Sequence, residues 1–250
     1  MTTVTLPATH ASEGWRYAPK GAVEALWPIE AEEIVVPAGA EGALDIVLED
    51  GAGDEARHLA LDLGEGAEFS LTLVNVAAGA RYARICVEAR LAAKARLTIG
   101  AVALAGGSAQ VEIVTEVTHA GPDAFSRQVI RQVAGGSGQV TYLGRVRVDV
   151  GADGTDGAQS VRAMLLSPTA QANARPELEI YADDVKCAHG CAVGELDRQA
   201  LFYLAQRGLP PAQAQALMLQ AFVAEALDGA DEALAARVAG QLAALTEAAA

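Results

Sequence analysis

The feature that most constrains this chain is a long run of short apolar segments, separated by small residues, between positions 31 and 183. Within Arg145–Val150 polar and apolar residues alternate strictly, which is typical of a β-strand with one buried face. The corners between segments recur at about fourteen residues or a multiple of that number. They are Gly39-Ala40, Gly66-Ala67, Gly79-Ala80, Lys94-Ala95, Ser108-Ala109 and Ser137-Gly138. No helical pattern interrupts this run, which argues against alternating βαβ units.

A regular rhythm of strand and corner is typical of a parallel β-helix, in which each turn of the chain stacks on the last. Val, Ile and Leu side chains would fill the inside of the coil, and glycine or small residues would allow the tight corners. We therefore predict a mainly β fold, a parallel β-helix, for residues 31–194. Periodicity alone leaves a β-sandwich as the competing fold.

The pattern changes to helical spacing after Gly194. One apolar stripe runs from Glu195 to Arg207 and stops at Gly208, a residue suited to the end of a helix. Pro210-Pro211 favours the start of a second helix, and Asp231 is a candidate N-cap for a third. The chain is thus predicted to have an N-terminal arm (1–30), a β-helix core (31–194) and a C-terminal helical domain (195–250).

Composition and charge exclude several classes of protein. The net charge of −14, with few and scattered Lys and Arg residues, argues against a nucleic-acid binder. Every stretch of about twenty apolar residues contains charge, so no membrane span is expected. The first residues do not read as a secretory signal, and we predict a cytoplasmic location. The three cysteines are too few and too unevenly placed for a disulfide framework.

The densest chemistry lies in residues 183–191, where Cys187, His189 and Cys191 occupy alternate positions. In an extended strand this spacing places all three side chains on one face. Two thiolates and an imidazole suit zinc or the iron of an iron–sulfur cluster. Three ligands are one short of a closed tetrahedral site, so we predict a site shared with another chain.

Other interpretations stay open at this point. Cys187 and Cys191 could be small strand residues, or a redox pair, although their spacing is not that of the CxxC motif. His10, His58 and His119 are isolated in the sequence, and Cys86 is interpreted as a buried small apolar residue. The sequence has no GxSxG elbow, Walker A motif or row of catalytic carboxylates, which favours a protein without an active site of its own. A stand-alone metal or redox protein and a carbohydrate-active β-helix enzyme are the alternatives.

The segment Pro176–Gly190, followed by Gly194, closely resembles the C-terminal signature of the SufB/SufD family of iron–sulfur cluster assembly proteins. Its KCxHG core resembles the SufD branch of that family. Leu201–Leu204 and Arg207–Leu209 are similar to the next block of the family, and Glu13–Tyr17 to its tryptophan-containing opening segment. The strong resemblance covers about residues 176–209.

This resemblance implies a right-handed parallel β-helix with a C-terminal helical domain, acting as a non-catalytic scaffold in the SUF complex. The implied partners are a SufB-like subunit and a SufC-like ABC ATPase, the latter held through the C-terminal helices. A transient iron–sulfur cluster is expected at the SufB interface, with His189 and Cys187 as candidate ligands and Cys191 just beyond the core motif. A homodimer of the isolated chain stays open. The N-terminal arm is shorter than the helical region of many family members.

Overall fold

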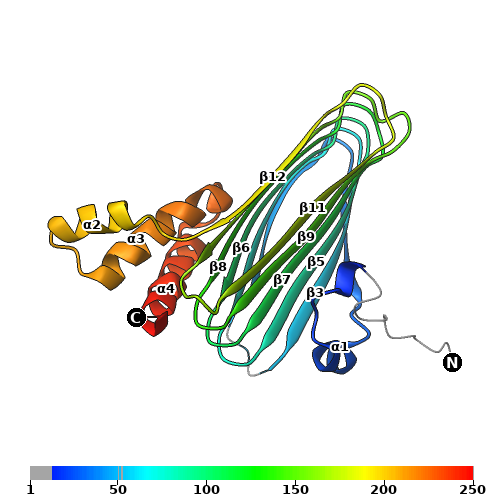
Figure 1. The fold of residues 1–250 in the computed structure, drawn as a ribbon. Coiled ribbons are helices and arrows are strands. Elements are labelled where there is room, and N and C mark those ends of the chain that lie inside the picture. The colour runs from blue at the N-terminus through cyan, green and yellow to red at the C-terminus, as the bar shows by residue number, and fades with distance from the viewer. Residues whose placement is uncertain (1–12, 50, 52, 250) are drawn as a thin grey trace.

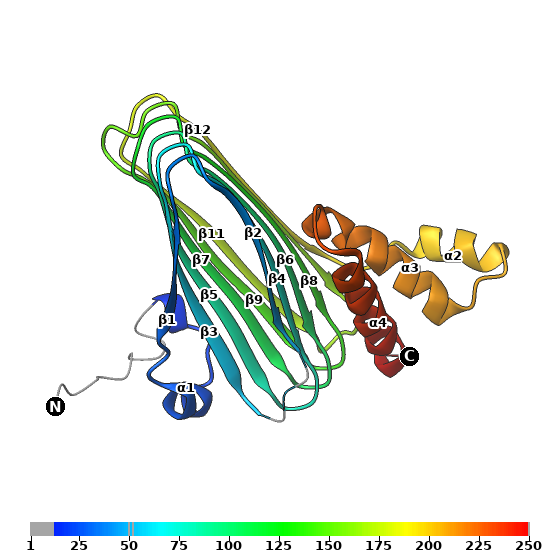
Figure 2. The ribbon, with the colours of Figure 1, turned by 180° about the vertical axis from the view of Figure 1, so that it is seen from behind.

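The computed structural model describes residues 13–49, 51 and 53–249, and its core is a parallel β-helix of about six turns (Figures 1 and 2). Successive strands alternate between two sheets, and all pairings are parallel. Sheet A contains β1 (Ala31–Val36), β3 (Glu55–Leu63), β5 (Tyr82–Leu91), β7 (Gln110–His119), β9 (Gln139–Val148) and β11 (Gln171–Ile180). Sheet B contains β2 (Glu41–Leu48), β4 (Glu68–Ala77), β6 (Arg96–Ala105), β8 (Phe125–Ala134), β10 (Asp156–Leu165) and β12 (Lys186–Gly194).

The register of the strands confirms the predicted period. Glu68 of β4 pairs with Arg96 of β6, so one turn of the coil takes 28 residues there. Each turn contains one strand of each sheet, and half a turn accounts for the rhythm of about fourteen residues. Because the pairing is parallel throughout the described strands, the β-sandwich alternative, which requires antiparallel sheets, is wrong.

The corners stack on one another as the strands do. One corner position has positive φ in successive turns, with Gly66 at 66° and Lys94 at 60°. The amide N–H of each donates to a carbonyl of the following turn, Gly66 to Ala93 and Lys94 to Pro122, both at 2.9 Å. Glycine adopts this backbone without strain, whereas the lysine is held in it by these stacked hydrogen bonds.

The interior of the coil is mostly apolar, and several buried polar side chains join it in the later turns. Leu71, Leu73 and Ile85 are among the fully buried side chains of the main core. Further along, the Tyr142 hydroxyl lies at the centre of a buried network of hydrogen bonds. It contacts Thr115 Oγ1 at 2.8 Å, donates to Gln128 Oε1 at 3.1 Å and accepts from Gln159 Nε2 at 3.2 Å.

Helices cover the outer face of sheet B. In Figures 1 and 2, α3 (Pro211–Val223), η2 (Ala224–Leu227) and α4 (Glu232–Ala249) lie against the coil, while α2 (Arg198–Gln206) projects away from it. Leu219, Val238 and Leu242 are buried against strand residues such as Val102 and Val129. The predicted cap is confirmed at Asp231, whose side chain accepts from the amide of Ala233. Among the described residues, no helix combines the length and apolarity needed to cross a membrane.

The helical boundaries differ slightly from those predicted. The first C-terminal helix starts at Arg198 rather than Glu195, because the Asp197 side chain caps it by accepting from the Gln199 amide at 2.8 Å. Gly208 follows this helix with φ of 86°, as a glycine stop signal should.

The part of the N-terminal arm that the structure describes packs on the outer face of sheet A. It contains η1 (Glu13–Trp15) and α1 (Lys20–Leu26), and Ala18, Ala22 and Val23 are buried against Tyr82. Trp15 and Trp27 meet edge to face, with ring centroids 5.8 Å apart. His10 lies outside the described residues.

A buried histidine in the interior should make stability depend on pH. His119 is fully buried, with its Nε2 atom 2.8 Å from Ser126 Oγ. Burial lowers the pKa of His119 from 6.5 to about 4. Between these values the unfolded chain binds a proton that the folded chain does not, so the free energy of unfolding decreases as pH falls through this window. We expect a loss of ~3 kcal/mol, since a tenfold change in proton affinity is about 1.4 kcal/mol.

Urea unfolding of the wild type and of His119→Gln, each at about pH 7 and about pH 4.5, measures this contribution. The glutamine does not titrate, so the loss of stability between the two pH values should be smaller in the variant. Equal losses in the two proteins would show that His119 does not contribute to the acid sensitivity.

Candidate functional site

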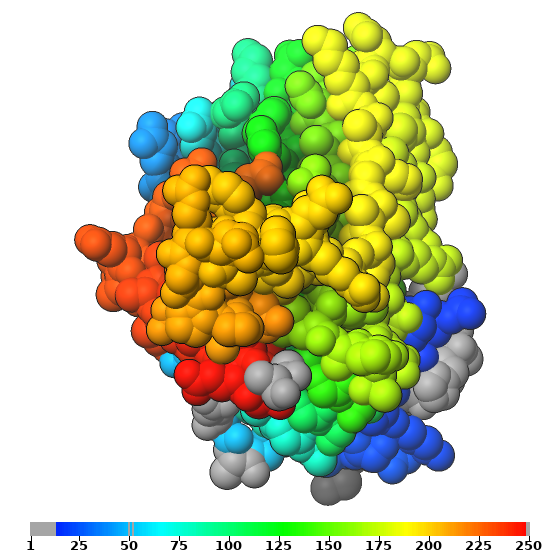
Figure 3. Space-filling model, turned by 60° about the vertical axis from the view of Figure 1, so that its left-hand side comes forward, coloured from blue at the N-terminus to red at the C-terminus, as the bar shows by residue number. Residues whose placement is uncertain are grey.

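The Cys/His segment forms β12, the last strand of sheet B, which pairs with β10 on one side only. Cys187, His189 and Cys191 lie at alternate positions of this strand, opposite Gly157, Gln159 and Val161 of β10. Strand geometry therefore places the three side chains on one face. Figure 3 shows β12 in yellow along the end of the coil, beside the projecting helices.

The environment of these three residues changes along the strand. Cys187 is half-buried against a small apolar cluster that includes Val146 and Val148, and burial raises the pKa of its thiol. His189 and Cys191 are exposed and line an open groove of about 680 Å³. Gln159 lies beside His189 in the sheet, and its amide belongs to the buried network around Tyr142. His189 therefore stands where the polar interior of the coil reaches the surface.

The three residues do not form a closed metal site in the single chain. Alternate residues of a strand are roughly 7 Å apart along its axis, too far for one ion to bind all three at ordinary bond lengths. Accordingly, the donor atoms of Cys187, His189 and Cys191 do not all lie within 4.8 Å of one another. One other group of residues in the described part of the chain does bring its donor atoms that close. The three residues of β12 therefore do not supply a complete set of metal ligands by themselves.

The strand geometry also argues against a redox pair of Cys187 and Cys191. Residues four apart on a strand have Cα atoms about 13 Å apart, whereas a disulfide requires less than about 7 Å. Both thiols are free in the structure.

A second cluster of possible metal ligands was not predicted from the sequence. His58 of β3 and Cys86 of β5 are direct register partners, and Glu88 is two residues further on the same face. Their donor atoms all lie within 4.8 Å of one another, and His58 Nε2 is 3.2 Å from Glu88 Oε1. His58, which is isolated in the sequence, therefore has two neighbours in the coil, and Cys86 is partly buried on the outer face of sheet A rather than in the core. The length of one turn could have predicted this cluster, because residues 28 apart in the sequence become neighbours in the coil.

Cys86 points to the outer face of sheet A, where the N-terminal arm partly covers it. Burial is the main reason that the pKa of its thiol is raised to about 11.

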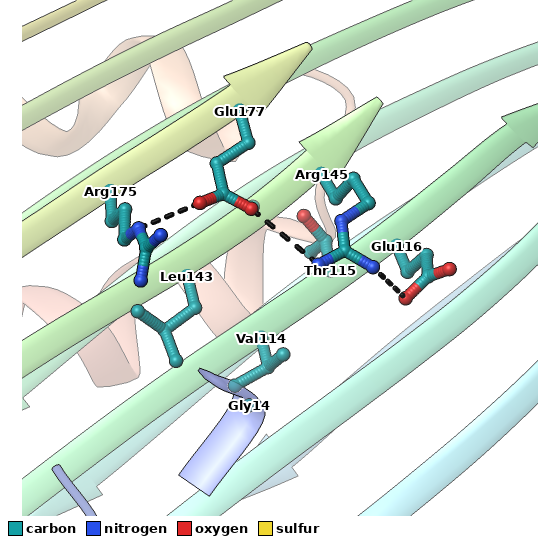
Figure 4. A pocket seen from close by; sticks show the side chains of 9 residues that line it. Gly14, Val114, Thr115, Glu116, Leu143, Arg145, Arg175 and Glu177 are labelled. Atoms are coloured by element: carbon teal, nitrogen blue, oxygen red, sulfur yellow. Dashed lines mark ion pairs between the residues drawn. The ribbon is translucent and has the colours of Figure 1, made fainter. Parts of the chain in front are cut away.

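Another hollow, of about 380 Å³, lies on the outer face of sheet A between β7, β9 and β11 (Figure 4). Arg145 pairs there with Glu116 at 3.5 Å and with Glu177 at 3.6 Å, and Arg175 Nε lies 2.6 Å from Glu177 Oε1. These alternating charges neutralise one another across three strands. We interpret them as cross-strand pairs that stabilise the sheet.

The fold and the unpaired strand β12 define the class of this protein. It is a parallel β-helix with C-terminal helices, and a strand that contains Cys and His lies at the open end of the coil. Comparison with known families then assigns it: residues 29–222 match the family described as SUF system FeS cluster assembly, SufBD core domain. The chain belongs to this family.

Individual relatives agree with this assignment. The chain is 39% identical over 100 residues to the iron–sulfur cluster assembly protein SufD of Escherichia coli, a match covering 40% of this chain and 24% of the relative. It is 40% identical over 108 residues to the chloroplastic protein ABCI7 of Arabidopsis thaliana, covering 43% and 23%. It is 29% identical over 178 residues to a SufBD family protein of Synechocystis, covering 71% and 39%. The matches thus span well under half of the length of these relatives.

Proposed function

We propose that this protein is a non-catalytic scaffold subunit of a SUF iron–sulfur cluster assembly complex. In this role it pairs with a SufB-like subunit and with a SufC-like ABC ATPase, which supplies the ATPase activity. The observation that carries the proposal is the open strand β12, which presents Cys187 and His189 at the edge of a sheet. Membership of the SufBD core family supports it.

The open end of the coil is suited to binding a SufB-like subunit. A free strand edge can accept a strand from a partner, and single-chain proteins normally protect such edges. Exposed apolar side chains also gather there, since Tyr181 is 54% and Val193 is 50% exposed. A transient cluster would then be held between the subunits, with His189 and Cys187 as ligands and Cys191 as a third candidate. The cluster is cargo of this complex rather than a resident cofactor.

The projecting helix α2 and the exposed face of α3 are suited to binding the ATPase. None of the residues of α2 is buried, and its Phe202 is 68% exposed. Tyr203 and, on α3, Leu217 are also exposed. Exposed aromatic residues of this kind are enriched in protein interfaces. Because α3 continues through η2 and α4 into the packing on sheet B, movement of the ATPase could be transmitted to the scaffold.

The alternatives have less support. Family membership does not favour a carbohydrate-active enzyme. A stand-alone metal protein that used Cys187, His189 and Cys191 would need a closed ligand set at β12, and the group of close donor atoms among the described residues does not include them. A cytoplasmic location stays a prediction, and the relative from Arabidopsis thaliana is named as chloroplastic.

Replacing His189 with alanine should lower the amount of cluster in the reconstituted complex about tenfold or more, because loss of even an outer-shell partner of a metal ligand costs about 10–100-fold in affinity. The measurement is iron, sulfide and visible absorbance after anaerobic reconstitution of this chain with its SufB-like and SufC-like partners.

Ala192→Ser is the matched control, since Ala192 is exposed on the same strand but at a position that faces the other way. It should leave the cluster content unchanged. A normal cluster content in His189→Ala would contradict the ligand role. Stoichiometric cluster in the chain without partners would favour the stand-alone metal protein.

A further inference from the structure

We propose that His58, Cys86 and Glu88 form a binding site for one divalent transition-metal cation, of the zinc and ferrous class. The site lies on the outer face of sheet A and is separate from β12, so this proposal goes beyond the proposed scaffold function. It rests on the arrangement of three donor atoms, on the pocket around them and on their combined charge.

The arrangement of the donors follows from the coil. Register pairing places His58 beside Cys86, and the alternation of β5 brings Glu88 to the same face. The imidazole nitrogen, the thiol sulfur and a carboxylate oxygen lie within 4.8 Å of one another. Ligands of one tetrahedral shell are roughly 3.3–3.8 Å apart when metal bonds are about 2.0–2.3 Å long. Small side-chain rotations are sufficient to close that difference.

The surroundings form a pocket. A cavity of about 310 Å³ includes the three donors and is walled by Trp15 and Trp27 of the N-terminal arm. The His58 side chain is 22% exposed and that of Glu88 is 58% exposed, so a cation can enter past the glutamate. Three protein ligands leave a fourth position free for water or another small ligand, and the cavity has room for it.

The donor set and its charge favour a particular class of cation. Nitrogen, sulfur and oxygen together suit zinc or ferrous iron, whereas calcium and magnesium prefer oxygen alone. Binding of the cation releases the proton of the Cys86 thiol to solvent. The resulting thiolate and the carboxylate neutralise the doubly charged cation, which lowers the cost of holding it in a half-buried pocket. Nearby Arg84 is already neutralised by Glu112 at 2.7 Å, so it adds little repulsion.

A salt bridge between His58 and Glu88 is the simpler explanation of part of this cluster. It does not account for the thiol, because a histidine and a carboxylate pair without one. The experiment must therefore ask whether sulfur takes part in binding a cation.

The test uses the full chain with Cys187 and Cys191 both replaced by alanine, so that Cys86 is the only one of the three cysteines left. Anaerobic titration with Co²⁺ should give one equivalent of binding and a sulfur-to-cobalt charge-transfer band. Zn²⁺ should abolish the band by displacement, since zinc favours such four-coordinate sites. In the same background Cys86→Ala should remove the band, and His58→Ala should weaken binding about 10–100-fold.

Glu116→Gln is the matched control, because Glu116 lines the same pocket but lies outside the three-donor group. It should change the affinity much less than Glu88→Gln, and circular dichroism shows whether each variant is folded. Absence of the band in the starting variant, or a band unaffected by His58→Ala, would overturn the proposal. Failure of the His189 experiment would leave this result unchanged, because the two sites share no residue.

Discussion

Replacing Arg84 with methionine should lower the free energy of unfolding by about 3–5 kcal/mol, because it leaves a buried carboxylate without its cation. Arg84 and Glu112 are register partners on β5 and β7, and their side chains are only 3% and 2% exposed. Their charged atoms lie 2.7 Å apart, and the Tyr82 hydroxyl donates to the same carboxylate oxygen at 2.6 Å. The guanidinium also stacks on Trp15, 3.8 Å from the ring centroid, so the variant loses contact with the N-terminal arm.

Urea unfolding measures the loss. The double variant Arg84→Met with Glu112→Gln is the control, because a neutral amide can still accept from Tyr82 but leaves no unpaired charge. It should be more stable than Arg84→Met alone. A loss below about 1 kcal/mol in the single variant, which is typical of exposed ion pairs, would mean that the pair is solvated.

Replacing Gly100 with valine should destabilise the packing of the helices on sheet B by at least about 3 kcal/mol. This value is the upper end of the usual cost of overpacking. A Cβ atom at Gly100 of β6 would lie 2.0 Å from the carbonyl oxygen of Ala226 in η2. The obstacle is backbone, so no side-chain rotation relieves the clash and η2 must move. Strand propensity favours valine over glycine, so it does not account for the expected loss, whereas this clash does.

Gly194→Val is the control for a β-strand glycine, because a Cβ atom there meets no atom within 4 Å. The measurements are urea unfolding and the rate of proteolysis within residues 195–249. Gly100→Val should be cleaved faster there, and Gly194→Val should behave like the wild type. Unchanged stability and cleavage in Gly100→Val would show that η2 is not held against the strand.

The fold was predictable because its local rules repeat. Corner residues and alternating strands recur with each half turn, so a parallel β-helix explained the spacing without any tertiary information. Strands with polar inward faces were harder to recognise. In β8, Ser126, Gln128 and Gln132 point into the coil, so the apolar alternation that marks other strands is missing. Pro176 also lies within β11, which tolerates it as the last strand of sheet A.

The candidate site at β12 was predictable in part. The spacing of Cys187, His189 and Cys191 was sufficient to place them on one face of a strand. Their position at an unpaired edge, where the polar interior reaches the surface, depends on where the coil ends. The cluster of His58, Cys86 and Glu88 escaped notice because its members meet only through the register of β3 and β5.

The sequence by itself determined the repeat, the change to helices after Gly194 and the chemistry available in residues 183–191, because each of these depends on neighbours along the chain. Only the tertiary structure decided which residues of different turns face one another, which face of sheet B the helices cover and which edge stays open. The physical reason is that burial and charge pairing act between residues about 28 positions apart. Such contacts exist only once the register of the turns is set.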